Sequence, residues 1–242
     1  MSDPKHVIGL SGGKDSTCLA LALNEREPRD YEYIFTPTGN ELPELFEHVD
    51  RLETLLGKPI KRLGIGKTLE QLIDEIGMIP NFRARWCTRM LKIEPAIDYM
   101  QTLPPGSIMY VGLRADEEMR EGIYGDDVTS DFPFRRWGWG IKEVWGYLDD
   151  RGVSVPERTD CGFCYHQRII EWRNFWAKHP ELYERAVQIE ERHGHTFRSP
   201  GRDTWPVKLV DMRKEFERGR KIRGEKKQLD MLDRGSCRVC SL

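Results

Sequence analysis

HVIGLSGGKDS, residues 6–16, is the stretch that decides the fold of this 242-residue chain. His6 to Leu10 is predicted to be a short buried strand, and Thr17 to Asn24 has the pattern of a helix that is apolar nearly all round. The glycines and serines between them are typical of a tight turn. Free backbone N–H groups and the positive end of the helix dipole meet at such a turn. We therefore predict an anion-binding loop at residues 11–16.

Strand and helix patterns alternate after this loop. Tyr31 to Phe35, Lys61 to Ile65 and Ile108 to Leu113 are predicted strands, and apolar residues at helical spacing predict helices over 45–56 and 69–76. Alternating units of this kind predict an α/β, Rossmann-like fold with a mostly parallel sheet and helices on both faces.

The overall charge and hydrophobicity exclude two classes of protein. Lys and Arg total 38 and Asp and Glu total 40, so the chain is not a polycation that coats nucleic acid nonspecifically. No apolar stretch approaches the roughly 20 residues that cross a bilayer, and the N-terminus lacks the pattern of a signal peptide. We expect a cytoplasmic protein with no membrane partner, and its oligomeric state is left open.

The loop carries the side chains that a phosphate site needs. Ser11 and Ser16 offer hydroxyl groups, the two glycines allow close approach of the backbone, and Lys14 supplies positive charge. Its spacing differs from the P-loop pattern Gly-x-x-x-x-Gly-Lys-Ser/Thr. Asp15 either ligates Mg²⁺ beside the phosphates or caps the following helix, and the sequence leaves both roles open.

Three further segments follow the loop at or near the ends of predicted strands. They are TPTGNELPE at residues 36–44, RWCTRMLKIEP at residues 85–95 and VGLRADE at residues 111–117. In this order, the four motifs resemble those of the phosphoadenylyl-sulfate (PAPS) reductase family. That family belongs to the adenine nucleotide alpha-hydrolase superfamily, in which the first motif is a pyrophosphate-binding PP-loop.

The resemblance implies a role for each motif. The phosphates of ATP or a PAPS-like adenine nucleotide would be contacted by Ser11, Gly12, Gly13, Lys14, Asp15 and Ser16. The adenosine side would be lined by Thr38, Gly39 and Asn40. Phosphate or sulfate oxygens would be reached by Arg89, Lys92 and Arg114. Lys14, Asp15 and Arg114 are the catalytic candidates, with Mg²⁺ as the accompanying metal. Arginine suits this role because its planar guanidinium can hold a phosphate by two hydrogen bonds.

The character of the sequence changes after Ser130. Residues 1–130 are predicted to form the PP-loop nucleotide-binding core, and residues 131–242 a helical C-terminal extension. Within the extension, helices are predicted near 142–148 and over 169–189, and a charged helical stretch over 207–232.

Five of the six cysteines are candidate metal ligands. Cys161 and Cys164 form one Cys-x-x-Cys pair, Cys237 and Cys240 form a second, and Cys87 stands alone. Four thiolates suit Zn²⁺ or an iron–sulfur cluster. The resemblance adds that adenylyl-sulfate reductases hold a [4Fe–4S] cluster with an adjacent Cys-Cys pair and a later Cys-x-x-Cys. One ligand of that set is missing here. Cys237 or Cys240 could replace it, or the two Cys-x-x-Cys pairs could form a site without Cys87, and unmetallated thiols remain an alternative.

Three functions are compatible with these motifs. The preferred one is cleavage of ATP to AMP and pyrophosphate, with AMP transferred to a substrate oxygen, either for sulfur transfer or for nucleic-acid modification. The first alternative is sulfonucleotide reduction, although the Glu-Cys-Gly-x-His tail of those reductases is absent. The second is a non-catalytic nucleotide-binding accessory protein.

A basic segment is a candidate contact for RNA or DNA. Arg213 to Lys227 is dense in Arg and Lys with apolar residues interleaved, a pattern that can follow a nucleic-acid backbone. Because several glutamates lie within the same segment, a solvated helix face is the competing interpretation.

Overall fold

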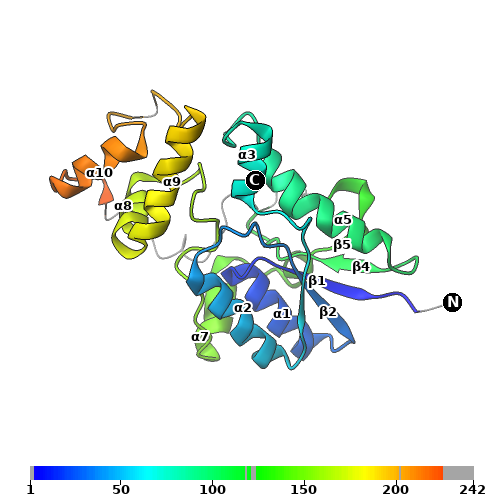
Figure 1. The fold of residues 1–242 in the computed structure, drawn as a ribbon. Helices are drawn as coiled ribbons and strands as arrows, with labels where there is room; N and C mark the ends of the chain where they lie inside the picture. The colour runs from blue at the N-terminus through cyan, green and yellow to red at the C-terminus, as the bar shows by residue number, and fades with distance from the viewer. Residues whose placement is uncertain (1–2, 118, 121–123, 202, 226–242) are drawn as a thin grey trace.

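A five-stranded parallel sheet forms the centre of the molecule (Figure 1). The computed structural model describes residues 3–117, 119–120, 124–201 and 203–225. The strands are β1 (His6–Leu10), β2 (Tyr31–Phe35), β3 (Ile60–Arg62), β4 (Ile108–Tyr110) and β5 (Ser130–Asp131). Their order is β3-β2-β1-β4-β5, and each neighbouring pair is parallel. The predicted Rossmann-like α/β fold is confirmed.

Helices cover both faces of this sheet (Figure 1). One face carries α1 (Lys14–Arg26), α2 (Pro43–Leu56), α6 (Pro133–Trp137) and α7 (Ile141–Asp150). On the other side lie α3 (Leu69–Ile76), α4 (Trp86–Thr88), the π-helix η1 (Arg89–Ile93) and α5 (Glu94–Gln101). A short 3₁₀ turn, η2, spans Gly125–Asp127. Because both faces are covered, β1 and β2 are largely buried, as strands of a parallel sheet usually are.

The remaining helices form a lobe beside the sheet (Figure 1). It contains α8 (Ile169–Lys178), α9 (Pro180–His193) and α10 (Leu209–Glu217). Its apolar core includes the fully buried Trp172 and continues into Leu69 and Ile73 of α3. The lobe and α3 therefore share one core.

The segment directly after residue 130 packs against α1 and the sheet. Phe134 of α6 and Val144 and Leu148 of α7 belong to the same apolar cluster as Ile8 and Leu10 of β1. The division of the chain at residues 130 and 131 stays a prediction. In the part of the chain that the structure describes, no helix has both the length and the apolar character needed to cross a membrane.

Several predicted boundaries were wrong. The strand over 61–65 is β3, which covers residues 60–62, and the strand over 108–113 ends at Tyr110. The helix predicted over 207–232 is α10, which ends at Glu217. Gly219 and Gly224 follow with φ of 68° and 71°, and this left-handed backbone ends a right-handed helix. Residues 226–232 of that prediction lie outside the described residues.

Candidate functional site

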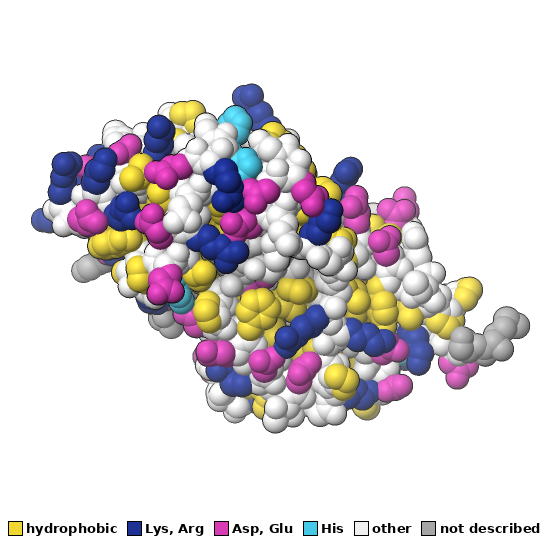
Figure 2. Space-filling view, viewed as in Figure 1, with side chains coloured by type: hydrophobic (Ala, Val, Ile, Leu, Met, Phe, Trp, Pro, Cys, Tyr) yellow, Lys and Arg dark blue, Asp and Glu magenta, His cyan; other side chains and the backbone are white. Residues whose placement is uncertain are grey.

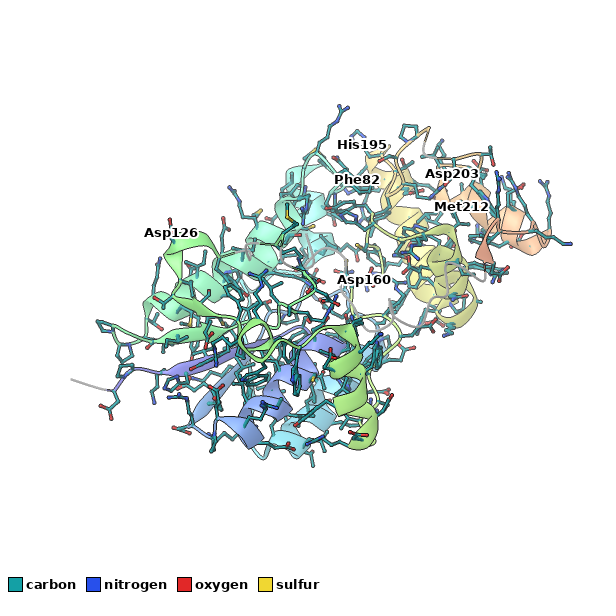
Figure 3. The ribbon with its side chains drawn as sticks, turned by 180° about the vertical axis from the view of Figure 1, so that it is seen from behind. Phe82, Asp126, Asp160, His195, Asp203 and Met212 are labelled. Carbon is teal, nitrogen blue, oxygen red and sulfur yellow. The ribbon has the colours of Figure 1, made fainter. Side chains whose placement is uncertain are left out.

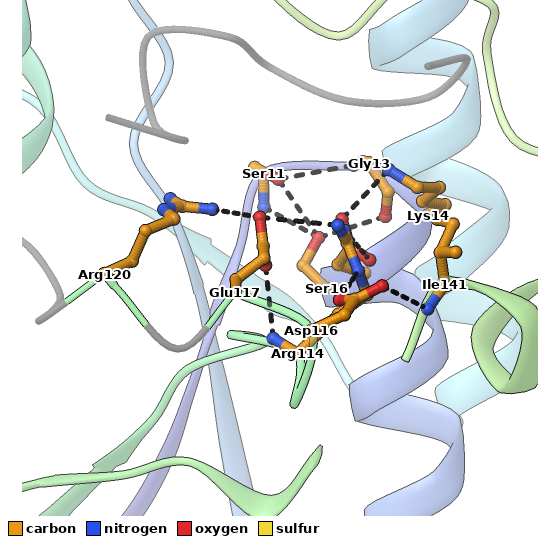
Figure 4. Close-up of polar contacts among 10 residues, drawn as sticks. Ser11, Gly13, Lys14, Ser16, Arg114, Asp116, Glu117, Arg120 and Ile141 are labelled. Carbon is orange, nitrogen blue, oxygen red and sulfur yellow. Dashed lines mark hydrogen bonds and ion pairs between the residues drawn. The ribbon is translucent and has the colours of Figure 1, made fainter. Parts of the chain in front are cut away.

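The loop between β1 and α1 is held by its own serine side chains (Figure 4). The Ser16 hydroxyl accepts a hydrogen bond from the Ser11 backbone N–H at 3.1 Å and donates one to the Gly13 carbonyl at 3.2 Å. The Ser11 and Ser16 hydroxyls are also 3.2 Å apart. These hydrogen bonds fix the shape of the loop, and it leads directly into the N-terminus of α1, where backbone N–H groups favour an anion.

Gly12 has a conformation and a location that suit glycine alone. Its φ is 71°, and a Cβ atom placed there would lie 2.3 Å from Leu45 Cδ1 of α2. The loop therefore packs directly on α2. Gly13, the N-cap residue of α1, has an extended backbone that other residues can adopt.

Alternating charges surround the first turn of α1 (Figure 4). The buried Lys14 ammonium lies 3.1 Å from Asp15 Oδ2, and Arg114 Nη1 lies 2.9 Å from Asp15 Oδ1. Arg114 Nε also donates to Asp116 Oδ1 at 2.9 Å, and its Nη2 is 3.4 Å from Glu117. Although burial disfavours its charged form, the Asp15 carboxylate raises the pKa of Arg114 above its ordinary value. The cluster keeps two cations at the loop.

The ion pairs of Arg114 allow it to exchange a carboxylate for a phosphate when a phosphate binds. Arg114 is fixed near the loop by carboxylates, so a phosphate oxygen can replace one of them without a large movement of the guanidinium. Both oxygens of Asp15 are paired with cations. If the phosphate oxygen replaces Asp15 as the partner of Arg114, the Asp15 carboxylate becomes available, and carboxylates are donors that Mg²⁺ prefers.

Thr38, Gly39 and Asn40 form a turn that follows β2, in which Thr38 and Asn40 are buried and Gly39 is exposed. The Thr38 N–H and hydroxyl donate to Glu41 Oε1 at 2.7 and 2.8 Å. The Asn40 side-chain oxygen accepts from the backbone N–H of Glu70 in α3. The turn thereby links β2 to α3, on the same edge of the sheet as the loop after β1.

Three of the predicted metal ligands line one cavity, called here the cysteine cavity. Its walls are formed by Thr38, Leu69, Pro80, Cys87, Thr88, Lys92, Asp160, Cys161, Phe163, Cys164 and Tyr165. Asp160 is labelled in Figure 3, between the segment around α3 and α4 and the helices α8 and α9. The sequence motifs identified Cys87 as one of the candidates to join Cys161 and Cys164, and the metal site itself stays a prediction. Cys237 and Cys240 lie outside the described residues.

Two thiols of this cavity, those of Cys87 and Cys161, have a pKa above the ordinary value. Burial, followed by the neighbouring Cys164, raises the pKa of Cys87 to about 11. The hydrogen bond with Cys164, followed by burial, raises the pKa of Cys161 well above its usual value. Among the described residues, no group of three or more His, Cys, Asp or Glu side chains is arranged to hold a metal ion. The three thiols share a cavity without forming a ligand set there.

The Cys161 to Cys164 loop is fixed by residues that the sequence analysis did not identify. Arg158 donates to Asp160 at 3.0 Å, to the Gln167 side chain at 3.1 Å and to the Cys161 carbonyl at 3.2 Å. Gln167 in turn donates to the Gly162 carbonyl at 2.5 Å. Such a network positions the cysteines rigidly. The one signal in the sequence that could have identified Arg158 and Gln167 is that they lie close to the Cys-x-x-Cys pair.

Backbone hydrogen bonds connect this loop to the turn after β2. An antiparallel bridge pairs Glu41 with Cys161, and the Gly162 N–H donates to the Asn40 carbonyl at 2.7 Å. Thr38, which precedes Asn40, lines the cysteine cavity itself. The segment predicted to contact adenosine is therefore in direct contact with the segment predicted to hold a metal.

The other predicted cations have varied surroundings. Lys92 lines the cysteine cavity, whereas Arg89 is exposed and pairs with Glu94 at 3.1 Å. Within the basic segment 213–225, Lys214 pairs with Asp211, and Arg218 and Arg220 both pair with Glu215. The surface of the helical lobe mixes Lys and Arg with Asp and Glu (Figure 2). Its cations are largely balanced by neighbouring carboxylates.

A parallel sheet with a glycine-rich loop after its first strand defines a Rossmann-like α/β protein. The chain belongs to the phosphoadenosine phosphosulfate reductase domain family, whose sequence model matches residues 5–164.

Two uncharacterized proteins of Methanocaldococcus jannaschii are similar in sequence. One is 26% identical over 226 residues, which cover 86% of this chain and 54% of the relative. The other is 24% identical over 199 residues, which cover 76% of this chain and 41% of the relative. The chain thus spans about half the length of the curated relatives it matches.

A crystal structure of PAPS reductase from Candida auris in a phosphate complex is similar in fold. The two chains are 16% identical with a TM-score of 0.51, over 64% of this chain and 76% of the other. At this identity the similarity concerns the fold alone.

Proposed function

We propose that this protein is a PAPS reductase-like enzyme that binds ATP and cleaves it to AMP and pyrophosphate, and so activates a substrate. The observation that carries the proposal is the preformed loop at the N-terminus of α1, with Lys14 and Arg114 held beside it by Asp15. Backbone donors and two cations at one point are the features that stabilise a pyrophosphate leaving group.

The residues divide the chemistry as follows. The loop holds the β- and γ-phosphates, so that the acceptor oxygen attacks the α-phosphorus and the bond between that phosphorus and the α–β bridging oxygen breaks. AMP joins the acceptor and pyrophosphate leaves with the bridging oxygen. Lys14 and Arg114 neutralise the charge that develops on pyrophosphate. When bound at the Asp15 carboxylate, Mg²⁺ would supply further charge neutralisation.

We also propose that Cys87, Cys161 and Cys164 bind a soft metal centre, either Zn²⁺ or a [4Fe–4S] cluster, with Cys237 or Cys240 completing it. The support is that the three described thiols line one cavity. Sulfur donors favour zinc and iron over Mg²⁺ and Ca²⁺ and do not separate the first two. The described side chains would need to turn toward one another to act as ligands.

Product analysis tests the proposed reaction. With ATP, Mg²⁺ and a panel of acceptors, including oligonucleotides and a sulfur donor, we expect pyrophosphate together with an equal amount of AMP, either free or joined to the acceptor. Chromatography separates these products from ADP and phosphate. ADP as the main product contradicts the proposal, because it would mean cleavage between the β- and γ-phosphates.

The same experiment distinguishes the second candidate, sulfonucleotide reduction, which the family name favours. Release of sulfite from PAPS or adenylyl sulfate when a dithiol reductant is added, without cleavage of ATP, would identify a reductase. Nucleotide binding with no turnover of ATP, PAPS or adenylyl sulfate would identify an accessory protein.

Metal analysis of anaerobically purified protein tests the cysteine site. We expect bound iron or zinc in the parent protein and loss of this metal in the Cys161→Ser/Cys164→Ser double variant, with a lower melting temperature, because bound metal contributes to folding stability. Cys18→Ala is the matched control, since Cys18 is packed in the core beside the sheet. Absence of both metals from the parent, with equal melting of parent and double variant, contradicts the site.

A further inference from the structure

Two of the three carboxylates around Arg114 also hold a second cation. Asp15 Oδ1 accepts a hydrogen bond from Arg114 Nη1 at 2.9 Å, and Asp15 Oδ2 lies 3.1 Å from the Lys14 ammonium. Glu117 Oε1 lies 3.4 Å from Arg114 Nη2 and 2.5 Å from Arg120 Nη1. Both carboxylates therefore divide their charge between two partners.

The third carboxylate, Asp116, joins Arg114 to the N-terminus of α7 (Figure 4). Its Oδ1 accepts a hydrogen bond from Arg114 Nε at 2.9 Å, and its Oδ2 accepts one from the backbone N–H of Ile141 at 3.0 Å. Ile141 is the first residue of α7, where the helix dipole favours a negative charge. Although burial disfavours the carboxylate, the Ile141 N–H and the Arg114 guanidinium lower the pKa of Asp116 below its ordinary value.

The backbone beside Asp116 is fixed to the same end of this helix. The Ala115 N–H donates to the Trp139 carbonyl at 2.8 Å. Gly140, the N-cap residue of α7, leaves room for the carboxylate, because a Cβ atom there would lie 3.2 Å from Asp116 Oδ2. Residues of α7 and α1 belong to one apolar cluster. Asp116 thus ties Arg114 to a helix that packs beside the helix following the phosphate loop.

This arrangement suits an exchange at one edge of the guanidinium only. Arg114 Nη1 faces Asp15, and a phosphate oxygen that replaces Asp15 binds at this atom. Asp116 holds Nε, on a different edge of the planar group. A loose arginine side chain would have to be ordered by the phosphate, at a cost in conformational entropy. A partner that stays at Nε during the exchange avoids most of that cost.

We propose that Asp116 is a positioning residue, which holds Arg114 by Nε while Asp15 is exchanged for a phosphate oxygen of the nucleotide. The proposal rests on the proposed function and adds to it a residue that acts through Arg114. It predicts an effect opposite to that of charge alone. Removal of a negative charge near a polyphosphate reduces repulsion and should strengthen binding, whereas loss of the positioning of Arg114 should weaken it.

Calorimetric titration of the full chain with ATP and Mg²⁺ tests this role. We expect Asp116→Asn to weaken ATP binding by roughly three- to tenfold, the effect of losing one ordinary hydrogen bond. Glu143→Gln is the matched control, because Glu143 Oε2 accepts from the Gly140 N–H at 2.8 Å and caps the same helix. This variant should bind ATP as the parent does. Thermal unfolding checks that each variant is folded.

A second variant removes the anchor of Asp116 and keeps both charged side chains. Ile141→Pro deletes the N–H that Asp116 Oδ2 accepts. Proline suits the first position of a helix, and the extended backbone of Gly140 suits the residue before a proline. We expect a loss of ATP affinity in the same direction as for Asp116→Asn.

A double-mutant cycle separates positioning from a structural effect on α7. Arg114→Met removes the guanidinium through which Asp116 acts, and should itself weaken ATP binding. In this background Asp116→Asn should cause no further loss of ATP affinity. A structural effect on α7 would instead lower the affinity equally in both backgrounds.

The outcomes separate this role from the proposed reaction. Unchanged or tighter ATP binding by Asp116→Asn, unchanged binding by Ile141→Pro, or an equal loss in the Arg114→Met background would each overturn the role of Asp116 and leave ATP binding intact. PAPS is titrated in parallel on the same variants. A parent that binds PAPS and not ATP contradicts the proposed function alone, and the same comparison is then made with PAPS. A parent that binds neither nucleotide contradicts both.

Discussion

Asp15 and Arg114 form an ion pair at the place where the phosphates of a nucleotide are expected. The motifs predicted both residues as parts of the site, because a loop between strand and helix and an arginine just after another strand are visible in sequence. Their mutual pairing was not predictable, since it depends on how the segment after β4 folds over α1. Arg158 was missed for a similar reason: a single charged residue in a loop carries no period or motif that reveals its burial.

Glu190 is another residue whose environment only the structure reveals. It is buried, and its two carboxylate oxygens accept hydrogen bonds from the backbone N–H groups of Phe197 and Leu209, at 2.9 and 2.7 Å. Burial raises the pKa of Glu190 from 4.5 to about 7, against the effect of these hydrogen bonds. The carboxyl therefore binds a proton more tightly in the folded than in the unfolded chain.

This shift predicts a pH-dependent stability. Because the folded-state pKa lies above the unfolded value, the free energy of unfolding should fall as the pH rises from about 4.5 to about 7, by roughly 2–4 kcal/mol. Glu190→Gln should remove this component, and the exposed neighbour variant Glu191→Gln should keep it. Urea unfolding at several pH values measures the effect. An unchanged pH profile in Glu190→Gln would show that Glu190 is not its source.

The long, regular elements were predictable, and the short ones were not. The strand at 31–35 and the helices near 45–56 and 69–76 have clear apolar periods, and the structure contains all three. Strand β5 has two residues and α6 has five, which is too short for a period to be detected. The helix α10 was extended too far because its charged pattern continues beyond Gly219.

The contact between the loop after β1 and α2 gives a test at this level. Gly12→Ala places a Cβ atom 2.3 Å from Leu45 Cδ1 and also strains the backbone, where φ is 71°. Gly57, at the end of α2, has a φ of 64° and open space around it. We expect Gly57→Ala to lower the free energy of unfolding by about 1 kcal/mol, through strain alone, and Gly12→Ala by roughly 2–4 kcal/mol. Denaturant unfolding compares them, and equal losses would mean that the packing of the loop on α2 contributes nothing.

At the level of the whole molecule, the turn after β2 is joined directly to the cysteine cavity. Thr38 lines the cavity. Glu41 pairs with Cys161, and the Asn40 carbonyl accepts a hydrogen bond from the Gly162 N–H, although the two segments are far apart in sequence. No local pattern predicts such a bridge. The sequence assigned residues 38–40 to a nucleotide site and Cys161 and Cys164 to a metal site, and the hydrogen bonds between the two segments required the fold.

The central claim, that the loop at residues 11–16 binds the phosphates of ATP, is tested most directly by calorimetric titration of the parent protein and Gly13→Val with ATP and Mg²⁺. The extended backbone of Gly13 can accept valine without strain, so its side chain should occupy the anion position while the fold is kept. We expect one ATP site per chain in the parent. In the variant, loss of charge-assisted hydrogen bonds worth about 1.5–3 kcal/mol should weaken binding by roughly ten- to a hundredfold. Equal ATP affinity in the parent and a folded Gly13→Val variant would contradict the claim.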